Sequence, residues 1–116
     1  MEELRLKKDV NFEEGKIYSI CLRGARIYSA DYSVDLYIYA PNGEINLNTG
    51  DTYPSLASIV SQKQFRFCDL RGNHCIDNYD ITARTLPGLE FAMYNVYDDF
   101  EETEIVTIVK FQIISI

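Results

Sequence analysis

The sequence is poor in the residues that most metal centres use. It holds one histidine and three cysteines among 116 residues, and it has no tryptophan. Zinc sites are typically built from Cys-x-x-Cys pairs or paired histidines, whereas Cys68, His74 and Cys75 are spaced Cys-x5-His-Cys. We therefore expect no metal site and no cofactor. The odd number of cysteines, Cys21 included, favours free thiols in a reducing compartment.

The same scarcity limits the catalytic hypotheses. A cysteine–histidine nucleophile needs the thiolate within hydrogen-bond reach of the imidazole. His74 and Cys75 are neighbours in sequence, and neighbouring side chains point apart on an extended chain. Only a fold that brings Cys21 or Cys68 to His74 would supply the geometry. We expect no catalytic residue, and an enzyme using His74 or a cysteine is the least favoured of three hypotheses.

Basic residues are also few. Eleven Lys and Arg stand against eighteen Asp and Glu, which gives a net charge of −7. Proteins that bind nucleic acid or anionic lipid neutralise phosphates with Lys and Arg. The composition argues against both partners and permits a basic partner protein. No apolar run approaches the roughly 20 residues of a membrane-spanning helix, and no leader-like segment follows Met1. We expect a cytoplasmic protein.

Glycine is rare and never occurs as Gly-x-Gly, so the sequence has no glycine-rich phosphate loop. A phosphate-bearing ligand would need arginines that fork onto its oxygens. Leu-Arg-Gly occurs at 22–24 and again at 70–72. If these two turns meet, their arginines and nearby tyrosines would form a nucleotide-like pocket; otherwise they pair with surface carboxylates. The candidate ligand-binding residues are Arg23, Arg26, Arg71, Tyr28, Tyr32 and Tyr79.

What the sequence has in abundance is alternating apolar runs. Hydrophobic residues make up 47% of the chain, with nine Tyr and six Phe, and aromatic residues favour strands. The pattern predicts a single all-β domain over 1–116, an antiparallel barrel or sandwich of seven or eight short strands. We expect the strands at 4–10, 16–22, 25–28, 36–40, 44–48, 63–70, 90–97 and 105–116. One short helix is expected at 55–62, with Ser55 as its cap.

The clearest local pattern is a hairpin over residues 36–48. A two-residue loop, Asn42-Gly43, would put Tyr37 and Tyr39 on a polar face. Pro41 has no N–H for the closing pair of that register. A three-residue loop from Pro41 to Gly43, with proline first in a type I turn, is therefore favoured. It would put Tyr37 and Tyr39 on one face with Ile45 and Leu47.

The segment 105–116 is expected to be the longest strand. It is apolar on both faces for most of its length. A strand of that kind is central in its sheet or lies in a subunit interface. On this basis we expect a homo-oligomer.

The strongest interaction signal is an acidic run. Five carboxylates occur in seven residues from Asp98 to Glu104. The run lacks the Asp-x-Asp-x-Asp-Gly ladder of a calcium loop, as does the shorter segment 77–80. We expect Phe100 to be exposed among the carboxylates and the run to dock on a basic protein surface. The leading hypothesis is a non-catalytic binding protein, such as a stoichiometric inhibitor or immunity-type module, that covers a partner surface. Its predicted partner-binding residues are Asp98, Asp99, Phe100, Glu101, Glu102 and Glu104.

Overall fold

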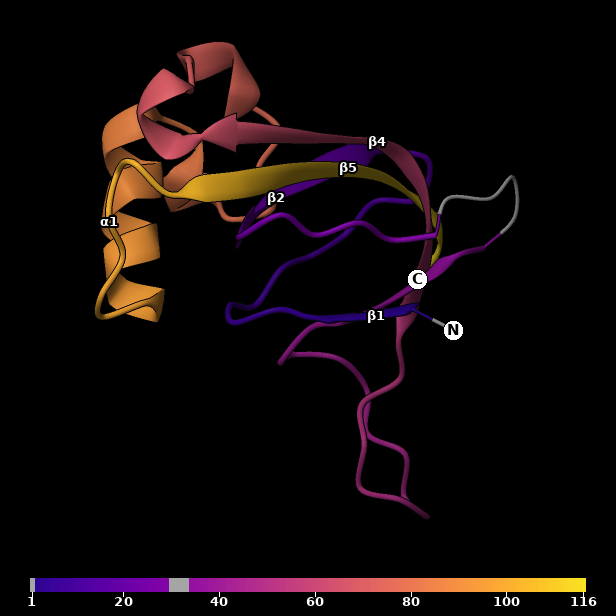
Figure 1. Cartoon of the computed structure of the whole chain (residues 1–116). Helices are drawn as coiled ribbons and strands as arrows, with labels where there is room; N and C mark the ends of the chain where they lie inside the picture. Colours follow the sequence, from indigo (N-terminus) through magenta and orange to yellow (C-terminus); the bar gives the residue numbers. More distant parts are fainter. Residues whose placement is uncertain (1, 30–33) are drawn as a thin grey trace. The chain divides into compact units, whose positions relative to one another are not determined.

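A computed structural model describes residues 2–29 and 34–116 of the chain (Figure 1). Within these residues five strands form one sheet in the order β1-β3-β4-β5-β2. The strands are β1 (Glu2–Arg5), β2 (Ile17–Arg23), β3 (Leu36–Tyr39), β4 (Ser55–Arg66) and β5 (Ile105–Ser115). The helical elements are three short 3-10 turns, η1 (Phe67–Asp69), η2 (Gly72–His74) and η3 (Ile81–Ala83), and the α-helix α1 (Leu86–Val96). The described chain is thus mostly β with one helix, and the predicted seven or eight strands were too many.

The chain divides into two compact units. Unit 1 comprises Met1–Ile17, Tyr28–Val60 and Phe111–Ile116, and unit 2 comprises Tyr18–Ile27 and Ser61–Lys110. Strands β1 and β3 belong to unit 1, and α1 with the three 3-10 turns belongs to unit 2. Strands β4 and β5 are each divided between the two units, with one part of the strand in each unit.

Unit 1 is organised around β3. Leu36 and Ile38 are fully buried, whereas Tyr37 and Tyr39 between them are half-buried, so the predicted period-2 alternation at this strand is confirmed. Strand β1 pairs with β3 in parallel, which makes the sheet mixed and not purely antiparallel. The predicted edge strand at 4–10 lies at the edge but ends at Arg5.

The predicted hairpin does not form. Strand β3 pairs antiparallel with β4, where Leu36 lies opposite the fully buried Ala57. Segment 44–48 closes instead on its own loop, through a bridge between Ile45 and Thr52. Both registers proposed for 36–48 are therefore wrong. Pairing with the long β4 buries an apolar face, which an Asn-rich strand at 44–48 does not offer.

The turn that was expected to start the hairpin is nevertheless present. The Gly43 N–H donates to the Ala40 carbonyl at 3.1 Å, which places Pro41 first of the two central residues. The side chains of Ile45 and Leu47 do not share a face with Tyr37 and Tyr39, and Leu47 is 97% exposed. Figure 1 shows the segment 40–54 extending beyond β1 and β3 of its unit.

Two predicted elements have the other type of secondary structure: the predicted helix is a strand, and a predicted strand is mostly helix. The predicted helix at 55–62 is the first part of the twelve-residue β4. The predicted strand at 90–97 lies mainly in α1, which begins after Thr85. The Thr85 hydroxyl accepts the Gly88 N–H at 3.2 Å, and Pro87 lies in the first turn, where its missing N–H is harmless. Leu89 and Met93, four residues apart, form the buried face of the helix.

Strands β2 and β5 follow their predictions closely. The Gly24 N–H donates to the Ile105 carbonyl, and the Ile113 N–H donates to the Lys16 carbonyl, so the two strands run antiparallel. The order of the sheet places β5 between β4 and β2, which confirms one of its two predicted positions, inside the sheet. The predicted subunit interface stays a prediction. With eleven residues, β5 is one residue shorter than β4, so it is not the longest strand.

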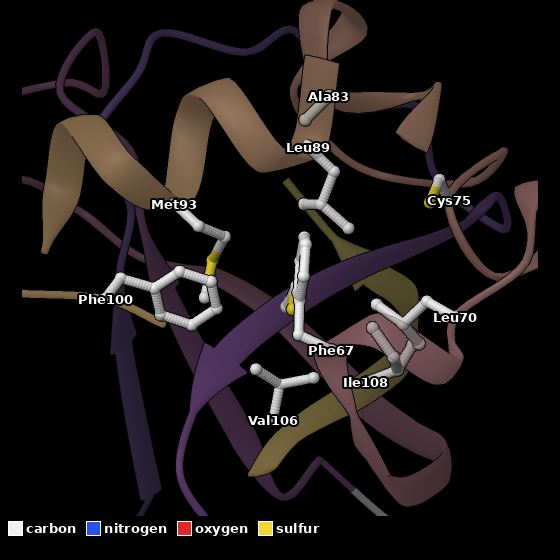
Figure 2. Packing of buried hydrophobic residues seen from close by; sticks show 10 residues of the cluster. Phe67, Leu70, Cys75, Ala83, Leu89, Met93, Phe100, Val106 and Ile108 are labelled. Atoms are coloured by element: carbon white, nitrogen blue, oxygen red, sulfur yellow. The ribbon is translucent and has the colours of Figure 1, made fainter. Parts of the chain in front are cut away.

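The core of unit 2 packs α1 against strand residues. Figure 2 shows side chains of α1 and of β5 directed toward Phe67. Phe67 begins η1, immediately after β4 ends. One face of α1 therefore packs in this core, and the opposite face lies outside it. The buried members are Cys21, Phe67, Leu70, Cys75, Ala83, Leu89, Met93, Phe100, Val106 and Ile108.

Candidate partner-binding surface

The acidic run connects α1 to β5 in unit 2 and is tied down by its backbone. The Phe67 N–H donates to the Glu104 carbonyl and the Cys68 N–H to the Glu102 carbonyl, both at 2.9 Å. The Glu104 carboxylate also accepts the Glu101 N–H at 2.6 Å. The loop is held to η1 at two points. Its carboxylates are therefore presented on a defined backbone.

Phe100 is buried, and its predicted exposure was wrong. It retains 3% of its accessible surface. Its ring lies edge-on to Phe67 at 5.1 Å between centroids and to Tyr94 at 5.5 Å. A large apolar ring gains more from this cluster than from water, so the acidic neighbours stay outside and the ring turns inward. Phe100 anchors the loop to the core and does not itself present a contact.

Arg23 joins the acidic run from strand β2. Its Nη1 lies 2.7 Å from Asp99 Oδ1 and its Nε 2.7 Å from Glu104 Oε1. Its guanidinium also lies over the Tyr97 ring, 5.4 Å from the centroid. Hydrogen bonds from Arg23 hold the pKa of both carboxyls below their usual range and raise that of Arg23. Arg23, which was predicted to bind phosphate, is thus paired with Asp99 and Glu104, which were both predicted to bind a partner protein.

The outer face of α1 carries exposed aromatic rings. Phe91 is 71% exposed and Tyr94 is 41% exposed, and their spacing of three residues puts them on the same side of the helix. Partial burial raises the pKa of the Tyr94 hydroxyl, and the carboxylates of Glu102, Glu90, Glu101 and Glu104 raise it further. These carboxylates are therefore near enough to act electrostatically on the Tyr94 hydroxyl. We call Glu90, Phe91, Tyr94, Glu101 and Glu102 the acidic–aromatic surface.

The helical part of this surface was missed because 90–97 reads as an alternating strand. Local signals for the helix exist: Thr85 as a cap, Pro87 in the first turn, and the apolar pair Leu89 and Met93. Of the other three carboxylates of the run, Asp98 and Asp99 are exposed and Glu104 is half-buried. Arg23 pairs with Asp99 and Glu104, so Asp98, Glu101 and Glu102 are the run's outward charges.

The other predicted ligand residues are not among the residues of this surface. Arg26 is exposed, and its backbone N–H donates to Thr107 Oγ1 at 2.9 Å. Arg71 is exposed, with Nη1 at 3.4 Å from the Leu70 carbonyl. Tyr79 is half-buried in unit 2, Tyr28 is buried in unit 1, and Tyr32 lies outside the described residues.

His74 contacts its neighbours in unit 2, and two of the three cysteines, Cys21 and Cys75, are buried. His74 Nδ1 accepts the Arg71 N–H at 2.8 Å, and its ring packs 4.5 Å from that of Phe65. Burial, reinforced by Cys75, raises the pKa of the Cys21 thiol to about 12, and burial raises that of Cys75 as well. A raised pKa disfavours the thiolate, the form of a cysteine that acts as a nucleophile. All three cysteines are free, as predicted.

The second acidic segment, 77–80, is engaged internally. The Asp77 carboxylate lies 3.6 Å from the Lys110 ammonium. The Asp80 carboxylate accepts the Thr82 N–H at 3.0 Å and caps η3. Across residues 2–29 and 34–116, no group of three or more His, Cys, Asp and Glu side chains is placed to hold a metal ion.

No protein-family model, curated protein or solved structure matches the chain. In the part of the chain that the structure describes, no helix has the length and apolarity to cross a membrane.

Proposed function

We propose that the chain is a non-catalytic binding protein that covers the surface of a basic partner protein, in the manner of stoichiometric inhibitors and immunity-type modules. The observation that carries the proposal is the acidic–aromatic surface. It combines two exposed rings, Phe91 and Tyr94, with the carboxylates of Glu90, Glu101 and Glu102. Aromatic anchors within a charged rim are typical of protein interfaces.

The supporting framework lowers the ordering cost of binding. Phe100 is packed in the core, and Arg23 bridges Asp99 and Glu104. The loop therefore does not need to be ordered by the partner, and less binding free energy is lost to conformational entropy. A surface ordered in advance suits one-to-one coverage of a folded partner.

The two kinds of residue are expected to contribute differently. Truncating a central aromatic anchor typically weakens an interface by about 2 kcal/mol or more. Rim carboxylates steer a basic partner and act mainly on the association rate, in a salt-dependent way. Phe91→Ala should therefore accelerate dissociation, whereas Glu101→Lys with Glu102→Lys should slow association.

The experiment begins with cross-linking and mass spectrometry on the host's own cell extract, to identify a partner. That partner is then purified and its binding rates are measured against the wild type and the two variants above. The matched control is Glu14→Lys with Glu44→Lys, which reverses two exposed carboxylates of unit 1. Equal weakening by both double reversals would mean that net charge, and not this surface, drives association. Unchanged rates in all variants would refute the proposal.

A further inference from the structure

The turn at 40–43 contains the one Asn-Gly step of the sequence. Asn42 is exposed, and its side chain joins the turn to residues 10–11 of the same unit. Its Nδ2 donates to the Val10 carbonyl at 3.2 Å and lies 3.4 Å from Asn11 Oδ1, and its Oδ1 accepts the Val10 N–H at 3.4 Å. We call these three hydrogen bonds the Asn42 clip.

We propose that Asn42 is a site of spontaneous deamidation and that its product loses the two hydrogen bonds that Asn42 donates in the clip. Asparagine is chemically labile, and a following glycine leaves the backbone nitrogen unshielded because it has no Cβ. The Gly43 nitrogen attacks Asn42 Cγ, the new C–N bond closes a five-membered succinimide, and the side-chain nitrogen departs as ammonia. Water then hydrolyses one of the two imide carbonyls and leaves aspartate or isoaspartate. Atoms balance with water as the only co-reactant.

The fold restrains this reaction at both reacting groups. The Gly43 N–H is engaged by the Ala40 carbonyl at 3.1 Å, and the Asn42 amide is held by the clip. Both must be released before the nitrogen can reach Cγ. Since a single hydrogen bond is equivalent to roughly tenfold in an equilibrium, deamidation should be at least about tenfold slower in the folded chain than in the unfolded chain.

The product can rebuild only one of the three bonds of the clip. A carboxylate has no N–H to donate, so the bonds to the Val10 carbonyl and Asn11 Oδ1 are lost, whereas its oxygen can still accept the Val10 N–H. Its negative charge also faces the Val10 carbonyl oxygen, which repels it. The reaction would therefore remove the two donated bonds between the turn and residues 10–11 and add one negative charge to the chain. This inference does not depend on the proposed function.

The first test compares the folded protein with the urea-unfolded protein at mildly alkaline pH. Peptide mapping by mass spectrometry follows the exchange of NH2 for OH at each asparagine, and isoaspartate is assayed separately. We expect modification at Asn42 in both samples, slower in the folded one. Asn48, exposed and followed by Thr49, is the internal control and should remain intact. A folded sample unmodified at Asn42 after roughly a hundredfold longer than the unfolded half-time would overturn the proposal, as would equal rates in both samples.

The second test examines the product directly through Asn42→Asp, with Asn48→Asp as a control of equal charge. The NMR carbon shift of the Val10 carbonyl reports the bond donated by Asn42 Nδ2. We expect this shift to change in Asn42→Asp alone, because the carboxylate donates no N–H to that carbonyl. An unchanged shift in Asn42→Asp, or an equal change in both variants, would overturn the claim that the product loses the donated bonds of the clip.

Discussion

Replacing Gly88 by alanine should destabilise the protein, although alanine is the better helix former. Inside a helix, Ala is favoured over Gly by roughly 0.5–1 kcal/mol. A Cβ at position 88, however, would collide with the Thr82 backbone carbonyl oxygen and lie 3.0 Å from Thr85 Oγ1. The carbonyl belongs to η3 and the hydroxyl caps α1, so neither moves without loss.

The opposing terms can be compared. Overpacking of this kind costs about 1–3 kcal/mol, and disturbing the Thr85 cap costs about 1 kcal/mol more. Subtracting the helical preference leaves a net loss of about 1–3 kcal/mol. Because Gly88 lies in the first turn of α1, the same clash should displace the helix that carries Phe91 and Tyr94.

Urea unfolding, followed by circular dichroism, measures the effect as a lower midpoint at unchanged slope. The matched control is Gly72→Ala, since a Cβ at Gly72 would meet open space and its backbone does not need glycine. That variant should be neutral or stabilising by up to about 1 kcal/mol. If Gly88→Ala proved as stable as Gly72→Ala, the close approach between α1 and η3 would be refuted.

Three further predictions concern the acidic run at 98–104 and the tip of segment 40–54, by which we mean the exposed Leu47. Because Arg23 lowers the folded-state pKa of Asp99 and Glu104, their contribution to stability is complete above the unfolded values near about 4 and is lost as the pH falls through the folded ones. Arg23→Gln should flatten that acid limb in a pH series of urea midpoints, and an unchanged limb would contradict the pairing. Phe100→Ala should lower the free energy of unfolding by about 3–5 kcal/mol in the same assay, whereas a loss below about 1 kcal/mol would mean that the ring is exposed after all. Leu47→Ser should change it by no more than about 0.5 kcal/mol, since Leu47 is 97% exposed, and a larger loss would show that the tip packs.

The fold was predictable where the local pattern has one solution. Strands at 17–23, 36–39 and 105–115 follow from apolar alternation or from a long apolar run. The turn through Pro41 follows from the constraint on its φ and its missing N–H. In each case a short stretch of chain carries enough information, because neighbouring residues decide the outcome.

Prediction failed where a segment is compatible with two structures. The spacing of Leu56, Ile59 and Val60 fits a helix, yet pairing with β3 draws residues 55–57 into β4. The alternation of 90–97 fits a strand, yet the Thr85 cap and the burial of Leu89 and Met93 produce α1. Short apolar runs do not distinguish the two periods, and tertiary packing selects one.

By itself, the sequence determined that the protein is mostly β, strongly acidic and equipped with a dense run of carboxylates. Only the tertiary structure decided what that run does with its neighbours. Phe100 turned inward because a core was available to it, and Arg23 reached Asp99 and Glu104 across 76 and 81 residues of sequence. Composition and local pattern depend only on residues that are close together in the sequence. Burial and ion pairing depend on which distant segments meet, and that is settled only when the chain folds.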